Sequence, residues 1–217
     1  MMRTWTPETA ADLRKAMILR RKRIGRALRV TGVLLVVAAI GVGGYVAWLL
    51  WGTGLTTQRE QARLRPQIEH VLNTKDPKTS PSVVKLPGDA VAVLVIPRID
   101  LNMVVVEGTD TESLKKGPGH YTDSAYPWQD HGRVAIAGHR TTYLHPFYSL
   151  DKLQPGDPII LKTEYGTFRY SVTRSFIIAP SDGSVLDQTK APTLVLTTCN
   201  PRYSAAQRLI VTADRVN

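Results

Sequence analysis

Cysteine is almost absent from this chain, which has one, Cys199, in 217 residues. A single thiol excludes an internal disulfide. Gly and Pro are modest in number, 16 and 14 residues, and this excludes collagen-like, mucin-like and disordered classes. Acidic residues are in deficit, 18 against 28 Lys and Arg, which leaves a formal net charge of +10. The hydrophobic content of 43% is that of a globular protein, so the meaning of the positive charge depends on where it lies.

The positive charge is concentrated at the N-terminus. Residues 1–29 hold nine Lys and Arg against two acids, a net charge of +7, which leaves +3 for residues 30–217. A basic excess is often a sign of nucleic-acid binding. Here the basic segment comes directly before an apolar run, where attraction to the anionic inner leaflet of a membrane already explains it. We therefore expect a cytoplasmic basic tail over 1–29 and no nucleic-acid partner.

The apolar run from Val30 to Trp51 contains no charged residue. About 20 apolar residues cross a bilayer as a helix, and Tyr45 and Trp48 lie where aromatic rings favour the interface. The positive-inside rule then places the C-terminal part outside the cell. A cleaved signal peptide has a shorter apolar core, about 7–15 residues, and a buried core helix lacks such flanking charge. We expect a single-pass anchor in the cytoplasmic membrane, with an extracellular domain.

Two segments of different composition follow the apolar run. Residues 57–73 carry Leu64, Ile68 and Leu72 at helical spacing, and Pro66 is expected to kink or interrupt the helix. Residues 74–88 are rich in Pro, Ser and Lys. We interpret 52–88 as an extracellular stalk or linker; the alternative is that residues 57–88 form a lid over the functional site. The folded domain is expected over 89–217.

Short β-branched segments separated by turn signals recur in that domain. One of them alternates strictly and places Phe168, Tyr170, Val172 and Arg174 on one face. Seven or eight strands in one domain of this size favour a closed, mainly β barrel with short helical turns. The expected strands are 91–96, 103–106, 133–137, 158–162, 166–176, 193–198 and 208–213, with helical turns at 111–116 and 147–153.

Cys199 lies at the end of an apolar strand (TLVLTTC). An unpaired thiol in an oxidising compartment is either used or buried. His139 ends a second apolar strand, and a neighbouring imidazole can activate a thiol and later protonate a leaving amine. Arg208 opens the last strand, where its guanidinium could stabilise an oxyanion. These residues predict thiol catalysis; the alternatives are an inert, buried Cys199 and a surface ion pair for Arg208.

The histidines do not form a metal-binding motif. His120, His131, His139 and His145 are spaced 11, 8 and 6 residues apart, which fits no compact ligand pattern, and no acidic cluster completes one. We expect no metal and no cofactor.

The three strand ends carry the pattern of a known family. TLVLTTC ending at Cys199, Ala-Gly-His ending at His139, and Arg208 in Arg-Leu-Ile-Val resemble sortases, the membrane-anchored cysteine transpeptidases of Gram-positive bacteria. The stretch AGHRTTY, followed by Pro-Phe, is most similar to class E, the branch common in high-GC species. The resemblance covers about residues 89–216 and implies an eight-stranded β-barrel.

The resemblance also implies a ping-pong reaction. Cys199 would attack the Thr–Gly carbonyl of an LPXTG- or LAXTG-like C-terminal sorting signal on a secreted protein, and form a thioacyl enzyme. An amine of a peptidoglycan cross-bridge or a pilin lysine would then resolve it. His139 would be the general acid and base, and Arg208 would stabilise the oxyanion or position the substrate. Candidates for substrate contact are Tyr121, Tyr143, Thr197 and Thr198.

Two points about those candidates stay open. Tyr121 is the candidate for the class E preference for Ala at the second signal position, and a packing tyrosine is the alternative. Thr197 and Thr198 are also ordinary strand residues, and by alternation only one of them shares a face with Cys199.

Three positions depart from the class E pattern. Arg133 is preceded by His131-Gly132 where Gly-Asn is usual, Leu144 stands where Gly is usual, and Asn200 where His is common. They fall at expected substrate or entrance positions, so the subclass and the signal preference are open. Two other functions are compatible with the same residues: a cysteine peptidase that only hydrolyses the thioacyl intermediate, and a non-catalytic, membrane-anchored adhesion or scaffold module.

Overall fold

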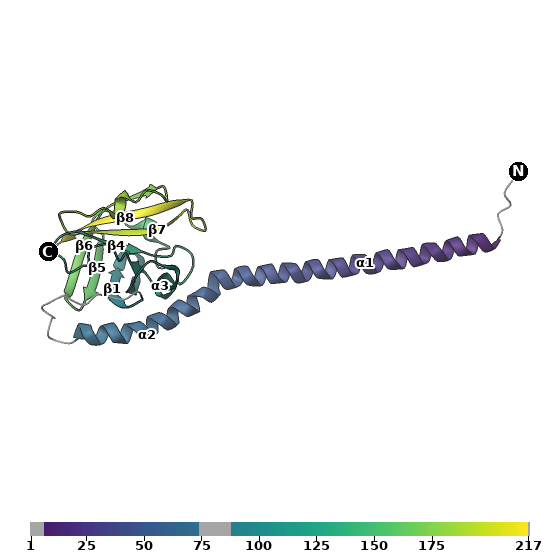
Figure 1. Cartoon of the computed structure of the whole chain (residues 1–217), viewed down its shortest axis with the longest axis horizontal. Helices are drawn as coiled ribbons and strands as arrows, with labels where there is room; N and C mark the ends of the chain where they lie inside the picture. The colour runs from purple at the N-terminus through teal and green to yellow at the C-terminus, as the bar shows by residue number, and fades with distance from the viewer. Residues whose placement is uncertain (1–6, 74–87, 217) are drawn as a thin grey trace. The chain divides into compact units, whose positions relative to one another are not determined.

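The structure is a computed structural model that describes residues 7–73 and 88–216. The chain divides between Trp48 and Leu49 into two compact units. The first is dominated by one helix, and the second contains a shorter helix and a β-barrel. Figure 1 shows these elements in the order of the chain.

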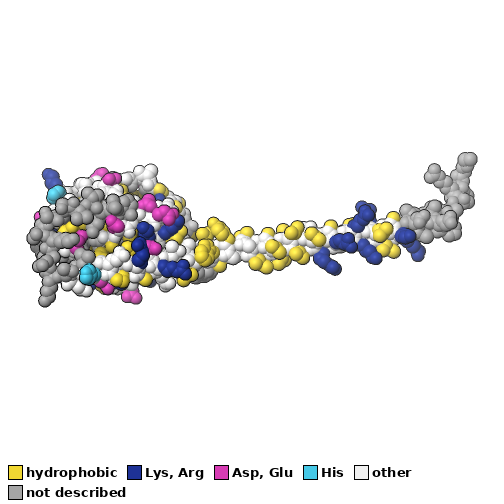
Figure 2. All heavy atoms as spheres, turned by 60° about the horizontal axis from the view of Figure 1, so that its bottom comes forward, with side chains coloured by type: hydrophobic (Ala, Val, Ile, Leu, Met, Phe, Trp, Pro, Cys, Tyr) yellow, Lys and Arg dark blue, Asp and Glu magenta, His cyan; other side chains and the backbone are white. Residues whose placement is uncertain are grey.

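Helix α1 (Pro7–Ala47) is a single helix of 41 residues that continues into a π-helical turn, η1 (Trp48–Gly52). Its side chains are exposed from Arg14 to Val46. Figure 2 shows Lys and Arg gathered on its N-terminal part and hydrophobic side chains on the rest. The stretch Arg14–Ala47 is long and apolar enough to cross a membrane. At about 1.5 Å per residue the helix is roughly 60 Å long, twice a bilayer's hydrocarbon core, so its basic part extends beyond the core.

Eight strands form a closed barrel in the order β1-β2-β3-β4-β7-β8-β6-β5. Neighbouring strands are antiparallel except for the parallel pairs β2–β3 and β4–β7. The closed, mainly β barrel predicted from the sequence is confirmed. The strands are Ala90–Ile96 (β1), Leu101–Glu107 (β2), Gly119–His120 (β3), Arg133–Ala137 (β4), Pro158–Thr163 (β5), Gly166–Ile178 (β6), Thr193–Asn200 (β7) and Gln207–Val216 (β8).

The short elements agree with the predicted turns. Helix α3 (Thr111–Lys116) begins after Asp110, whose side chain accepts hydrogen bonds from the N–H groups of Glu112 and Ser113. The 3₁₀ turn η3 (Leu150–Lys152) lies within the predicted 147–153. Two further 3₁₀ turns are η2 (Pro97–Ile99) and η4 (Ser184–Leu186). The strand that was not predicted is β3, because two residues are too few to show a period.

The core fills the barrel interior, and strand alternation decides which residues enter it. Leu194 and Leu196 of β7 belong to the interior cluster, whereas Val195 packs in a separate cluster with Ala135 and Ile210. That second cluster lies on the opposite face of β4, β7 and β8, which we call the outer face. The barrel therefore has a closed apolar interior and a second, partly apolar surface outside.

A β-bulge changes the predicted face of β6 halfway along it. Phe168, Tyr170 and Val172 are buried in the interior as predicted. The register against β8 shifts between Val172 and Arg174, and Arg174 is exposed. A bulge adds one residue to one strand, so later side chains of the same parity point to the other face. Phe176 accordingly packs on the outer face, so the prediction is right only as far as Val172.

Helix α2 (Thr53–Asn73) packs against the barrel. Leu64 and Ile68 are buried against Val93, Val104 and Val106, which lie on the outside of β1 and β2. The helix continues through Pro66, so of the predicted kink or interruption the interruption is absent.

The expected stalk over 52–88 is therefore corrected for residues 53–73, and the barrel unit begins at Leu49 instead of residue 89. The physical reason is that the apolar residues at helical spacing in α2 pack against apolar side chains on the outside of the barrel. The Pro-, Ser- and Lys-rich segment lies almost entirely outside the described residues.

Candidate active site

The register of β7 and β8 places Cys199 directly opposite Arg208. Directly opposed residues share a face, with their Cβ atoms about 4.5–5.5 Å apart. The Nη1 group of Arg208 donates to the carbonyls of Ala205 and Gln207, both at 3.1 Å, which holds the guanidinium at the start of β8. Arg208 is therefore the residue paired with Cys199, whose side chain is half-buried, on the same face of the sheet.

His139 reaches the same end of the sheet from β4. The parallel pairing of β4 with β7 matches Ala137 with Thr197, and the N–H of Gly138 donates to the carbonyl of Thr197 at 3.1 Å. His139 and Cys199 each come two residues after that matched pair, on strands about 4.8 Å apart. The structure thus brings the three predicted catalytic residues to one edge of three adjacent strands.

The ring of His139 packs against Tyr143, with ring centroids 4.8 Å apart. Burial lowers the pKa of His139 below its ordinary value of 6.5, because the charged form loses hydration. The imidazole is therefore mainly neutral at neutral pH, the form that can accept a proton from a thiol.

The turn that carries Tyr143 is left-handed over three residues without glycine. Tyr143, Leu144 and His145 have φ values of 52°, 59° and 38°. Such residues cost about 1–3 kcal/mol each and persist where the surroundings hold them in place. Glycine adopts such a backbone without steric cost, so Leu144 stands at a position whose φ of 59° favours glycine.

Tyr121 and Thr197 meet on the outer face. The hydroxyl of Tyr121 and Oγ1 of Thr197 are 3.1 Å apart, and Thr197 is two residues before Cys199 on the same side of β7. Tyr121 also packs against the outer-face cluster, so it has a packing contact and a polar contact near the thiol. The cluster consists of Ala135, Val195 and Ile210, with Tyr121, Phe176, Ile178, Val185 and Leu186 partly buried against it.

Thr198 faces the opposite way. Its side chain is only 3% exposed, and its hydroxyl donates to the carbonyl of Gly138 at 2.7 Å. That bond ties β7 to the residue before His139. Of the two threonines, Thr197 is therefore the one that shares a face with Cys199.

An ion-pair cluster with one buried member, Arg140, adjoins the backbone of Cys199, and sequence reasoning missed it. Arg140 is 5% exposed; its guanidinium donates to the carbonyl of Cys199 at 3.4 Å and pairs with Asp151 at 3.2 Å. Asp151 also pairs with Arg202 at 2.9 Å, and both arginines donate to the carbonyl of Tyr148. Burial lowers the pKa of Arg140, which the charge of Asp151 opposes. The cluster joins the β4–β5 loop to the strand end that carries Cys199.

His120 also has a structural partner. Its Nδ1 lies 3.2 Å from both carboxylate oxygens of Glu107, and its Nε2 lies 3.0 Å from the carbonyl of Ala125. Ser124 lies 3.0 Å from the same Nε2 and donates to the carbonyl of Tyr121, so this buried pair supports the turn after Tyr121. Within residues 7–73 and 88–216, no group of three or more His, Cys, Asp and Glu side chains gathers as a metal site.

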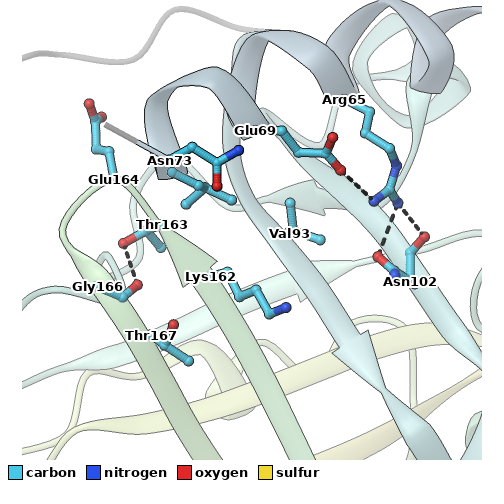
Figure 3. A pocket seen from close by; sticks show the side chains of 11 residues that line it. Arg65, Glu69, Asn73, Val93, Asn102, Lys162, Thr163, Glu164, Gly166 and Thr167 are labelled. Atoms are coloured by element: carbon cyan, nitrogen blue, oxygen red, sulfur yellow. Dashed lines mark hydrogen bonds and ion pairs between the residues drawn. The ribbon is translucent and has the colours of Figure 1, made fainter. Parts of the chain in front are cut away.

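A cavity of about 680 Å³ lies near the other end of the barrel, between the C-terminal half of α2 and the β5–β6 turn. Figure 3 shows Lys162 and Thr167 lining it, with Arg65 bonded to Glu69 and Asn102. The β5–β6 turn is opposite the end that carries Cys199, because the β8 residue paired with Ile178 of β6 is Arg208. This cavity is therefore separate from the edge of the sheet that holds Cys199, His139 and Arg208.

A family model for the sortase domain matches residues 94–216, which is more than half of the chain. The chain belongs to the sortase family. Sortases are cysteine transpeptidases, and the chain's one thiol lies at the strand edge described above. The sortase resemblance and the enzyme class predicted from the sequence are both confirmed.

Relatives named as class D and as class E sortases both match. Sortase D of Bacillus subtilis is 33% identical over 199 residues, which is 87% of this chain and 98% of that protein. Sortase SrtE1 of Streptomyces coelicolor is 30% identical over 211 residues, 90% of this chain and 57% of that protein. Class E-like sortases are thus among its relatives, as predicted, and the similarity to class D extends over nearly the whole of the Bacillus protein.

Solved sortase structures have the same barrel. A Clostridium perfringens sortase D5 superposes with a TM-score of 0.66 at 30% identity, covering 73% of this chain and 99% of that one. Sortase E1 of S. coelicolor superposes with a TM-score of 0.57 at 33% identity, covering 61% of this chain and 91% of that one.

Proposed function

We propose that Cys199 is the nucleophile, His139 the general acid and base, and Arg208 the cation that stabilises the oxyanion or positions the substrate. The observation that carries this proposal is the strand register, which puts Cys199 opposite Arg208 and places His139 at the same end of β4. Cys199 is only partly buried, which favours a reactive thiol over the inert one of a scaffold module.

The substrate is a C-terminal sorting signal of the LPXTG or LAXTG type on a secreted protein. His139 takes the proton of the Cys199 thiol, and the sulfur attacks the carbonyl carbon of the signal's Thr; the Thr–Gly bond then breaks as His139 gives that proton to the departing Gly amine. An amine attacks the carbonyl carbon of the thioacyl enzyme and loses a proton to His139; the C–S bond breaks, and His139 returns the proton to the sulfur, which restores the thiol. The structure of S. coelicolor sortase E1 holds a tripeptide in its active site, which supports peptide binding in this family.

The signal binds along the outer face beside Cys199. Tyr121 and Thr197 offer two hydroxyls there, next to apolar side chains that can receive the signal's small or apolar residues. Tyr121 is the residue we assign to a preference for Ala at the second signal position. Tyr143 contacts the signal on the side of the site where its ring packs against His139. Thr198 acts indirectly, through its bond to Gly138.

The catalytic unit works outside the cell. Helix α1 is the anchor in the cytoplasmic membrane, and its basic N-terminal part stays in the cytoplasm by the positive-inside rule. The acceptor is then an amine of the wall side, from a peptidoglycan cross-bridge or a pilin lysine.

The test is transpeptidation by the full-length chain in lipid nanodiscs. Fluorogenic LPXTG and LAXTG peptides are supplied with oligoglycine or a lysine-bearing acceptor, and ligated product is measured by mass spectrometry, with Cys199→Ala as the control. We expect amine-dependent ligation and faster turnover of LAXTG. Hydrolysis alone at saturating amine would indicate a peptidase. Failure of a small methanethiosulfonate to label the folded protein would indicate a scaffold module.

A further inference from the structure

The first turn of α2 touches the loop that carries His139. Thr53 is only 7% exposed; its Oγ1 donates to the carbonyl of Leu49 at 3.0 Å and accepts from the N–H of Tyr143 at 3.2 Å. The next residue, Gly54, leaves so little room that a Cβ there would lie 3.2 Å from Cδ2 of Leu144. Two successive residues of α2 thus meet two successive residues of the β4–β5 loop.

Those two loop residues are the ones that need support. Tyr143 and Leu144 open the left-handed turn, which a chain without glycine adopts only when neighbouring groups hold it. Tyr143 in turn packs its ring on His139. Tyr143 therefore links α2 to His139, the proposed acid and base. Its backbone N–H bonds to Thr53, and its ring packs against the imidazole.

Helix α2 also forms hydrogen bonds with the end of α3 and with β2. Thr57 is fully buried, and its hydroxyl donates to the carbonyl of Lys115 at 2.7 Å. The amide of Gln61 donates to the carbonyls of Lys116 and Val104 and accepts from the N–H of Val104. Lys116 ends α3, which leads through β3 to Tyr121.

Farther along α2, Arg65 binds Asn102 of β2 (Figure 3). Polar contacts thus run along α2 from its first turn to its C-terminal half.

We propose that Thr53 is a positioning residue of the transpeptidase: its hydroxyl, with Gly54 beside it, sets the turn that holds Tyr143 against His139. The proposal rests on the role proposed above for His139. It extends the catalytic apparatus beyond the barrel to the first turn of the helix that follows η1, the segment directly after α1.

The test uses three variants of the full chain in nanodiscs. Thr53→Val keeps the shape of the side chain but removes the acceptor for Tyr143. Thr53→Ser keeps the hydroxyl, and Thr56→Val makes the same change at an exposed position of the same helix. We expect kcat of Thr53→Val to fall about tenfold with KM unchanged, because displaced catalytic groups lose orientation. The other two variants should stay within about twofold of the wild type.

A second readout needs no substrate. With ¹³C-labelled histidine, assigned by a His139→Gln variant, the titration midpoint of His139 is followed by NMR. Loosening Tyr143 admits water to the ring, so the midpoint should rise towards the ordinary value in Thr53→Val and stay in place in the other two variants. An unchanged midpoint, or an equal loss of activity in Thr53→Ser, overturns the proposal. If the wild type ligates no peptide but the midpoint still moves, the proposed function fails and the positioning role stands.

Discussion

The two faces of β7 differ in chemistry although they alternate along one strand. Leu194, Leu196 and Thr198 point inward, where the leucines pack in the core and the threonine hydroxyl donates to the carbonyl of Gly138, the residue after β4. Val195 and Thr197 belong to the outer face, which Cys199 continues to the strand end. The inward face holds the strand in place, and the outward face carries Thr197 and Cys199. Substitutions on the two faces should therefore separate activity from stability.

The largest expected effect is on the outward face. Cys199→Ala removes the proposed nucleophile, so turnover of a sorting peptide should fall by roughly 10³-fold or more. The melting temperature should stay close to that of the wild type, because the thiol is small and only partly buried. Peptide cleavage followed by fluorescence and a thermal melt measure both. Turnover above the uncatalysed background would remove Cys199 from the mechanism.

The second-largest effect is expected from a substitution on the inward face. Leu196 is fully buried, and Leu196→Ala should lower the free energy of unfolding by about 2–5 kcal/mol through lost packing and a cavity. The fraction that remains folded should keep its kcat. Urea denaturation and activity per folded molecule are the measurements. An intact stability with a lost kcat would mean that the two faces are not separable in this way.

A smaller effect is expected where the inward face meets the β4–β5 loop, which carries His139. Thr198→Val leaves the buried carbonyl of Gly138 without this donor and should cost about 1–3 kcal/mol of stability. Because Gly138 precedes His139, we also expect a modest fall in kcat, which Thr198→Ser should restore. A kcat unchanged in Thr198→Val would confine Thr198 to stability.

The smallest effect concerns the pH dependence of stability. Burial depresses the pKa of His139, so below the ordinary pKa of 6.5 the unfolded chain binds more protons than the folded one. This residue therefore destabilises the fold as the pH drops through that range and has no such effect above it. His139→Gln should lose less stability than the wild type between pH 7.5 and 5, as measured by denaturation at each pH. An equal loss in both proteins would contradict the burial of the imidazole.

Local patterns explain which parts of the fold could be predicted. Seven strands and helix α3 show up as alternation or turn signals within short windows, and residue type at strand ends indicates Cys199, His139 and Arg208. The bulge after Val172 leaves no such mark, because the pattern of residue types continues through it.

What could not be predicted depends on contacts between distant residues. Thr53 meets Tyr143 across 90 positions, and Arg140 meets Cys199 across 59. Neither pair has a spacing that a sequence pattern could reveal. The docking of α2 was missed for the same reason, since a helix face shows that it is apolar but not what it packs against.

The parallel pairing of β4 with β7 also bears on how the enzyme matures. His139 and Cys199 are 60 residues apart, and Arg208 lies in β8, the last strand. Contacts between residues so far apart in the sequence form late in folding, because the chain loses entropy on closing the long loop before the strand pairing contributes any stabilisation. Cys199 therefore acquires both neighbours only after β8 has been synthesised and has added to the sheet. A nascent chain still lacking β8 carries the cysteine without Arg208 opposite it.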